Sequence, residues 1–294
     1  MRRLKRVAVI GVGLIGGSFA MALRRAGGVT SIVGVDRDAQ ALERAAALGV
    51  IDTAAGSVSE ATKGADLVMV AVPVRAIGTV LHDVGLALDP GATVTDAGST
   101  KGDVAGIARE ELRALFPRFV PGHPIAGRES SGVDSASADL FKGARVVLTP
   151  EEETAPDALD LVRSCWEAAG ARVALLTALD HDRIFAAVSH LPHLLSFALV
   201  SEFTSRANAA ELFGFAAGGF RDFTRIAASS PEMWRDIALQ NRAALLDELD
   251  RYGTRLAVFR ELIDKGDGPG LQRLMAEARA SRQALGARRG PSNE

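Results

Sequence analysis

Residues 7–18 read VAVIGVGLIGGS. The apolar run 7–10 predicts a buried strand, and the turn that follows leads directly into an apolar helix. In that turn Gly11 permits a tight bend, Gly13 lets the backbone approach a ligand, and Gly16 allows close packing of helix on strand. The stretch therefore predicts the first unit of a dinucleotide-binding sheet.

The same turn predicts the cofactor. A diphosphate group fits against the free N–H groups and the positive dipole end of the helix. Asp36 ends the second predicted strand, and its carboxylate suits both ribose hydroxyls and repels a 2′-phosphate, which favours NAD over NADP. Arg37 beside it softens that preference. The residues assigned to the cofactor are Gly11, Gly13, Leu14, Ile15, Gly16, Asp36, Arg37, Val72 and Pro73.

The first half of the chain alternates short apolar runs with helical stretches. Such runs, bounded by Gly, Pro or Asp, are typical of strands buried on both faces of a parallel sheet. The predicted strands are 7–10, 32–35, 67–72, 93–95 and 146–148, and the predicted helices are 15–26, 38–48, 75–88 and 100–115. Helix 156–169 and strand 172–176 complete a doubly wound parallel α/β domain of the Rossmann type.

The second half is predicted to be all-α. Thr177 and Asp180 form a T-x-x-D capping box that opens a long helix. Ser230-Pro231 opens another helix of about thirty residues, whose apolar stripe needs a partner. We therefore expect a homodimer formed through the helical domain. The predicted domains are a dinucleotide-binding domain over 1–178 and a helical substrate and dimerisation domain over 179–294.

Composition limits the classes of function. The 294 residues include 34 Lys and Arg against 36 Asp and Glu, a formal net charge of −2, and neither half has an excess of basic residues. A nucleic-acid partner is therefore not expected. The single cysteine argues against a disulfide framework and a Cys-rich metal site, and it fits a cytoplasmic protein. We expect no metal, no signal peptide and no membrane-spanning run.

The histidines are the first candidates for chemistry. His82 and His181 fall on predicted helix surfaces, where a solvated role is expected. His123 lies in the rigid loop PGHPIAG (121–127), which can present an imidazole at a cleft. The loop alone leaves a catalytic and a structural role equally open. His190 and His193 share one face of a long helix that Pro192 is expected to kink.

Two further motifs contribute polar side chains. DAGSTK (96–101) lies at the carboxyl edge of the sheet, where ligands bind in this architecture, although Ser99 or Thr100 also suits helix capping. In GGFRDFTRIA (218–227), Arg225 can grip a carboxylate bidentately, and a surface salt bridge is the alternative. The chain lacks the Lys-x-x-x-Asn pattern of β-hydroxyacid dehydrogenases.

With DHDRIFAAVSHLPH (180–193), these motifs occur in an order that resembles the prephenate/arogenate dehydrogenase family of tyrosine biosynthesis. The resemblance runs through residues 5–263. It implies a Rossmann domain followed by a helical dimerisation domain, and an NAD-dependent oxidative decarboxylation of a 4-hydroxycyclohexadiene that carries a ring carboxylate. No chorismate mutase segment precedes the motifs and no regulatory domain of usual length follows them, so we expect a monofunctional member.

The resemblance also implies a role for each matched residue. His123 is the base for the ring hydroxyl, and Ser99 orients His123 near the nicotinamide. Arg225 binds the ring carboxylate, and His193 contacts the substrate side chain. The residues expected to border the pocket are Ser189, His190, Glu129, Arg221, Asp222 and Trp234. The substrate is a small dicarboxylate, and local cations must hold it in a slightly acidic protein.

Three hypotheses remain at this point. The preferred one is an enzyme that converts prephenate to 4-hydroxyphenylpyruvate, with arogenate, or both substrates, as the alternative. A second is another hydroxyacid dehydrogenase of similar architecture, which the missing Lys-x-x-x-Asn pattern disfavours. A third is a non-catalytic nicotinamide-binding sensor or scaffold, which predicts cofactor binding without turnover.

Overall fold

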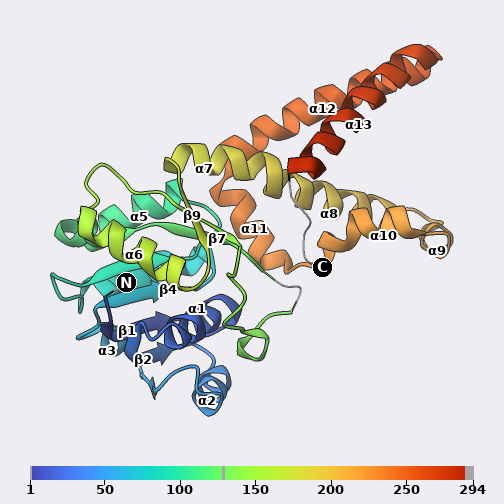
Figure 1. Cartoon of the computed structure of the whole chain (residues 1–294). Coiled ribbons are helices and arrows are strands. Elements are labelled where there is room, and N and C mark those ends of the chain that lie inside the picture. Colours follow the sequence, from blue (N-terminus) through green and yellow to red (C-terminus); the bar gives the residue numbers. More distant parts are fainter. Residues whose placement is uncertain (1, 128–129, 289–294) are drawn as a thin grey trace. The chain divides into compact units, whose positions relative to one another are not determined.

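The computed structural model describes residues 2–127 and 130–288 (Figure 1). The chain divides into two compact units, Met1–Ala244 and Leu245–Glu294. The first unit holds all the strands and all the described residues assigned to the cofactor and the substrate. The second unit is built from the helix α12 (Arg242–Asp264), apart from its first three residues, and the helix α13 (Gly268–Arg288). The predicted domain boundary at 178/179 stays a prediction.

A six-stranded parallel sheet forms the centre of the first unit, in the order β3-β2-β1-β4-β5-β6. Its strands are β1 (Leu4–Ile10), β2 (Val29–Val35), β3 (Thr53–Ala54), β4 (Leu67–Val70), β5 (Thr93–Asp96) and β6 (Phe119–Val120). The winding direction reverses between β1 and β4, which pair Val9 with Met69. The switch point therefore lies beside the glycine-rich turn, and the doubly wound Rossmann prediction is confirmed.

Helices cover both faces of this sheet (Figure 1), because alternate side chains of a strand point to opposite faces. Val7 and Val9 join one core, with α1 and α6, while Ala8 and Ile10 join the other, with α3, α4 and α5. In the first core the rings of Phe19 and Trp166 lie 4.7 Å apart. The helices are α1 (Leu14–Arg25), α2 (Ala39–Ala47), α3 (Val58–Thr62), α4 (Ile77–Gly85), α5 (Gly102–Leu112) and α6 (Pro156–Ala168).

The predicted strands 146–148 and 172–176 do not extend the main sheet. They are β8 (Arg145–Leu148) and β9 (Arg172–Leu175), and with β7 (Gly122–Ile125) they form a separate sheet, β7-β8-β9. Pro121 stands between β6 and β7, and because proline has no N–H to donate, the chain leaves the main sheet there. This exit places His123 on β7, directly beyond the carboxyl edge of β5 and β6.

One helical run carries three of the histidines. It comprises α7 (Ala178–Phe185), a π-helical turn (Ala186–His190) and α8 (Leu191–Thr204), in that order. The π turn ends two residues before Pro192 and is the local distortion that proline was expected to cause. By length and composition alone Ala178–Thr204 is apolar enough to cross a membrane, so the expectation that no such run exists is wrong. The absence of a membrane partner stays a prediction.

The thirty-residue helix expected from Pro231 is interrupted. α11 (Pro231–Gln240) is followed by Asn241, whose φ of −98° and ψ of 33° are not helical, and α12 begins at the next residue. The Asn241 side chain donates to the carbonyl oxygen of Asp182 at 2.7 Å, which explains why this position leaves the helical conformation. Two short helices, α9 (Ala209–Gly214) and α10 (Gly218–Thr224), lie between α8 and α11.

Candidate active site

The glycine-rich turn is packed on two sides and open on the third. Gly11 has a φ of +92°, and a Cβ there would lie 2.4 Å from the carbonyl oxygen of Ala71. A Cβ on Gly16 would lie 2.0 Å from the carbonyl oxygen of Gly11. A Cβ on Gly13 would meet no atom within 4 Å. Space is therefore left where a diphosphate would approach the start of α1.

Asp36 holds the end of β2 against this turn. Its carboxylate accepts hydrogen bonds from the N–H of Val12 at 2.9 Å and from the N–H of Asp38 at 3.0 Å. The side chain of Val72 borders Gly11, and Arg37 is exposed beside Asp36. An open turn with a carboxylate at the end of β2 fits a dinucleotide whose ribose hydroxyls are free.

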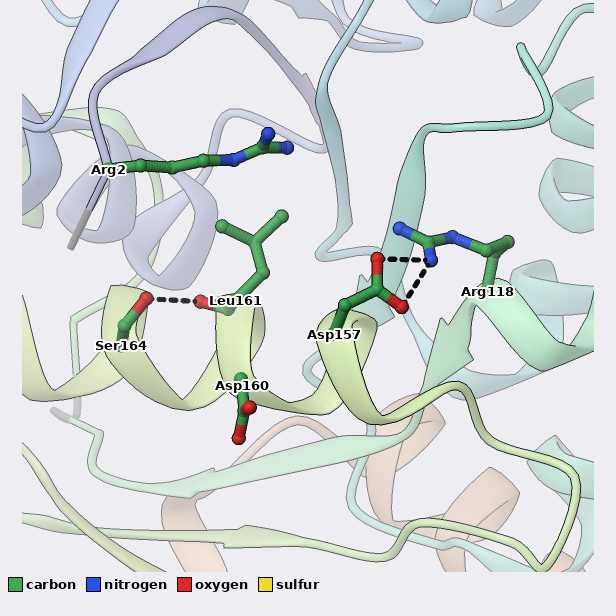
Figure 2. A pocket seen from close by; sticks show the side chains of 6 residues that line it. All are labelled: Arg2, Arg118, Asp157, Asp160, Leu161 and Ser164. Atoms are coloured by element: carbon green, nitrogen blue, oxygen red, sulfur yellow. Dashed lines mark hydrogen bonds and ion pairs between the residues drawn. The ribbon is translucent and has the colours of Figure 1, made fainter.

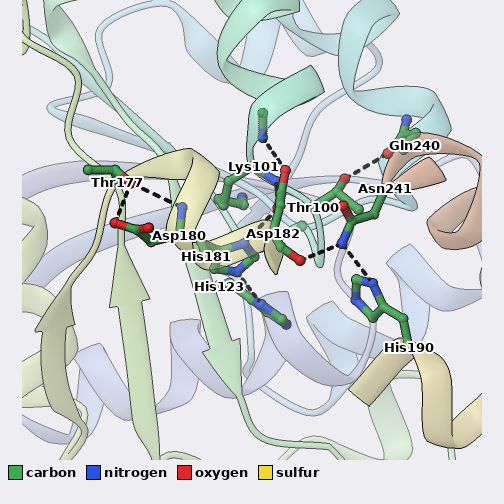
Figure 3. A network of polar contacts seen from close by, with 12 residues as sticks. Thr100, Lys101, His123, Thr177, Asp180, His181, Asp182, His190, Gln240 and Asn241 are labelled. Carbon is green, nitrogen blue, oxygen red and sulfur yellow. Dashed lines mark hydrogen bonds and ion pairs between the residues drawn. The ribbon is translucent and has the colours of Figure 1, made fainter. Parts of the chain in front are cut away.

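A second set of polar groups connects β7 with α7 (Figure 3). Nδ1 of His123 lies 2.8 Å from Nε2 of His181, and Nδ1 of His181 lies 2.8 Å from Oδ1 of Asp182. His181 is completely buried, and His123 is half-buried. The expectation that His181 faces solvent is therefore wrong, because α7 turns this residue towards β7 rather than outwards.

Asn241 links α7 to the π turn (Figure 3). Its amide donates to the carbonyl of Asp182 at 2.7 Å and lies 3.0 Å from Nδ1 of His190. Because the Asn241 amide donates to Nδ1, a neutral His190 carries its proton on Nε2. That Nε2 is buried and has no hydrogen-bond partner within the described residues. His190 therefore offers one free N–H donor.

A buried ion pair fixes the strand that carries His123. Nζ of Lys101 donates to Oδ2 of Asp96 at 2.5 Å and to the carbonyl of Gly122 at 2.7 Å. The other Asp96 oxygen accepts the N–H of Gly122 at 3.0 Å. Both charged side chains are completely buried. The pair therefore holds the residue before His123 by both its N–H and its carbonyl.

His193 on α8 and Trp234 on α11 form an aromatic pair. The imidazole stacks on the indole with ring centroids 3.6 Å apart, and Nδ1 of His193 donates to the carbonyl of Ser189 at 2.8 Å. Burial lowers the pKa of His193, the hydrogen bond to Ser189 opposes this, and the charge of Arg225 lowers it further. Arg225 is thus close enough to act on His193 electrostatically.

Both halves of the chain match parts of one family. Residues 19–175 match the nucleotide-binding domain of prephenate dehydrogenase, and residues 177–277 match its dimerization domain. This chain belongs to the prephenate dehydrogenase family. Its family membership confirms the resemblance drawn from the five motifs.

Three relatives show how far the likeness to this family extends. A cyclohexadienyl dehydrogenase of Zymomonas mobilis is 36% identical over 97% of this chain and 97% of its own length. The crystal structure of A. aeolicus prephenate dehydrogenase in complex with hydroxyphenyl propionate and NAD+ superposes with a TM-score of 0.90, at 37% identity, over 96% of this chain and 98% of that one. Synechocystis arogenate dehydrogenase superposes with a TM-score of 0.82, at 34% identity, over 95% and 99%.

The other predicted site residues lie outside the hydrogen-bonded groups described above. Ser99 is half-buried, and its hydroxyl makes no hydrogen bond to His123 within the described residues, so the role of Ser99 in orienting His123 stays a prediction. Arg221 and Asp222 are exposed on α10, and Pro73 is exposed after β4. Glu129 lies outside the described residues.

The sequence analysis missed the residues that support His123. Lys101 and Asp96 lie in a motif that was noticed, but spacing does not show that a lysine five residues after a strand end folds back to its aspartate. His181 and Asp182 are adjacent in a helix, and a helical pattern does not reveal which face meets another element. The buried ion pair and the interrupted helix at Asn241 are set by tertiary contacts.

A separate surface hollow lies away from these residues (Figure 2). Its volume is ≈ 340 Å³, and it is lined by Arg2, Arg118, Asp157, Asp160, Leu161 and Ser164. The guanidinium of Arg118 is held by the Asp157 carboxylate at 2.7 Å, so this arginine serves the local structure.

Across residues 2–127 and 130–288 no group of three or more His, Cys, Asp or Glu side chains is arranged to hold a metal.

Proposed function

We propose that this chain is an NAD-dependent prephenate dehydrogenase, which oxidises and decarboxylates prephenate to 4-hydroxyphenylpyruvate in tyrosine biosynthesis. The observation that carries the proposal is the placement of His123 beyond the carboxyl edge of the sheet whose switch point holds the glycine-rich turn. Family membership and the NAD+ complex of the A. aeolicus relative support the same cofactor and reaction.

The residues present fit NAD. The turn at Gly11–Gly16 receives the diphosphate against the start of α1, and Asp36 receives the ribose hydroxyls. When bound, NAD supplies a hydride acceptor. The chain's own residues must then bind the substrate, orient it and move one proton.

His123 is the group that moves the proton. Its Nε2 accepts the proton of the ring hydroxyl as hydride leaves the ring carbon that bears this hydroxyl. Carbon dioxide then departs with its bonding electrons left in the ring, which becomes aromatic. The proton returns from His123 to the ring oxygen, so the product is a phenol and no net proton is consumed. Ser99, at the carboxyl edge of β5, is assigned to the same region of the site.

Substrate binding is assigned to the helical residues. Arg225 binds the ring carboxylate, and His193 contacts the side chain, with Ser189, His190, Arg221 and Trp234 around it. The carboxylates of prephenate require cationic partners such as Arg225. Arogenate, which carries an ammonium group in its side chain, is the alternative substrate. The likeness to Synechocystis arogenate dehydrogenase is the reason to test it.

We also propose a cytoplasmic homodimer. The match of residues 177–277 to a family dimerization domain supports self-association through the helical half. Exposed apolar side chains on α12 and α13, including Leu256, Ile263 and Met275, suit such an interface.

The test is NADH formation with each substrate and each cofactor. Prephenate and arogenate are offered separately, first with NAD and then with NADP, and carbon dioxide release is followed in parallel. We expect NADH and carbon dioxide in equal amounts from prephenate with NAD. Cofactor binding without turnover of either substrate would instead identify a sensor or scaffold.

A further inference from the structure

Three side chains form a hydrogen-bonded series that ends at His123 (Figure 3). Asp182 is bonded to Nδ1 of His181, and Nε2 of His181 is bonded to Nδ1 of His123, each at 2.8 Å. The ring of Phe185 packs against both imidazoles, with centroids 4.8 Å from His123 and 4.5 Å from His181. The series joins α7 to β7, so it exists only in the folded chain.

These hydrogen bonds determine which ring nitrogens carry protons. The Asp182 carboxylate also accepts the N–H of Lys101 at 2.9 Å and of Gly102 at 2.8 Å. An ionised carboxylate can only accept, so His181 donates from Nδ1 and, when neutral, presents the lone pair of Nε2. His123 must then donate from Nδ1. Its own lone pair is left on Nε2.

The surroundings keep the three groups in these states. Burial opposes ionisation of Asp182, but hydrogen bonds from His181 and two backbone N–H groups outweigh it and lower its pKa. Burial lowers the pKa of His181 although its hydrogen bond to Asp182 opposes this. Burial, and then the electrostatic effects of His181, Lys101 and His190, lower the pKa of His123 well below its usual value. The charged or titratable groups that face the two imidazoles are Asp96, Lys101, Asp182 and His190.

We propose that His181 and Asp182 are positioning residues that hold His123 in the one tautomer whose Nε2 can accept a proton. The inference rests on the proposed function and extends it to the residues behind the base. In the reaction the substrate hydroxyl loses its proton to Nε2, and His123 becomes an imidazolium. His181 stabilises that cation by accepting from Nδ1, and Asp182 stays ionised throughout. The same proton returns to the ring oxygen when carbon dioxide has left.

The tautomer can be observed without any activity. Protein labelled with ¹⁵N at histidine is studied by two-bond ¹H–¹⁵N correlation spectra at pH 7, and His123 is assigned by its loss in His123→Asn. We expect His123 protonated on Nδ1 and unprotonated on Nε2. Protonation on Nε2 in the wild-type protein would overturn the proposal. This measurement needs no variant of His181, so it decides even if such a variant fails to fold.

Two substitutions of His181 test the positioning role. His181→Leu keeps much of the volume but removes the acceptor, whereas His181→Gln retains a terminal oxygen that can accept from His123. For His181→Leu we expect kcat to fall by a factor between about 10 and about 10⁴. The larger factor is the loss that is typical when a histidine base is held in the wrong tautomer. KM for prephenate and for NAD should change little, and His181→Gln should recover most of the lost kcat. His82→Leu, in an exposed histidine, is the matched control.

The outcomes separate the two proposals. A kcat unchanged in His181→Leu, or a His181→Gln variant that is folded and as slow as His181→Leu, would overturn the positioning role. If the wild-type protein turns over neither prephenate nor arogenate, the proposed function fails, and the spectra still report the tautomer of His123 by themselves.

Discussion

The imidazole of His193 stacks on the indole of Trp234, with ring centroids 3.6 Å apart and planes inclined by 19°. The stack joins α8 to α11, and the charge of Arg225 acts on His193, where it lowers the pKa of the imidazole. An aromatic pair beside an arginine is suited to a flat, anionic ring substrate. In the proposed site the substrate-binding groups are on these helices, and the proton acceptor is on β7.

Arg225→Gln tests that separation. In the proposed role, Arg225 binds the carboxylate in both the ground state and the transition state, so its loss is expected mainly to raise KM for the substrate, about tenfold or more, with kcat little changed. Steady-state kinetics with prephenate measure both constants. Arg206→Gln, in an exposed arginine that pairs with Glu202, should leave both unchanged. A large fall in kcat at constant KM would assign Arg225 to the chemical step.

Lys101→Met tests the buried ion pair. Removing one partner leaves the Asp96 carboxylate buried without its cation, which typically costs about 3–5 kcal/mol. We expect that loss in the free energy of unfolding in urea, together with lower activity, because Gly122 loses one of its hydrogen bonds. Lys63→Met, at an exposed lysine, should cost far less. Equal stability of the two variants would contradict the structural role of the pair.

The glycine turn allows a paired experiment. In Gly13→Ala the new Cβ meets no protein atom within 4 Å, so stability should be kept while NAD binding weakens. In Gly16→Ala the Cβ would lie 2.0 Å from the carbonyl oxygen of Gly11, so the protein itself should be destabilised. Thermal unfolding without cofactor and calorimetric titration with NAD measure the two effects. Similar thermal stability of both variants would argue against this geometry.

The burial of His190 predicts that the folded protein is less stable in acid than at neutral pH. Burial lowers the pKa of His190 to about 4, so the folded state stays neutral where the unfolded chain takes up a proton. Its contribution is fully present above about pH 6.5 and is lost as the pH falls towards 4, by about 3 kcal/mol.

Urea unfolding between pH 7 and pH 4 measures this loss. His190→Asn keeps an acceptor for Asn241 and should flatten the acid decline, whereas His82→Asn, at an exposed histidine, should not. An unchanged decline in His190→Asn would show that other groups control the acid sensitivity.

Local patterns predicted much of this molecule. The apolar run before Gly11 and the capping box at Thr177 each act over a few residues, and the first strand and the start of α7 follow from them. Other features depend on contacts between distant segments. β7 was missed because its sequence, with Pro121 before it and Pro124 inside it, is typical of a loop, and it becomes a strand only by pairing with β8. His181 acquires its role only because α7 meets β7.

His123→Asn is the decisive variant, because both proton transfers of the proposed reaction pass through this imidazole. An asparagine cannot take up the hydroxyl proton at neutral pH, and a positioned base typically contributes about 10²–10⁴-fold to the rate. We measure kcat and KM for prephenate with NAD in the wild type and in His123→Asn, with the fold checked by circular dichroism. We expect kcat to fall by that factor with KM little changed. A folded His123→Asn enzyme that keeps the wild-type kcat would show that another group accepts the proton.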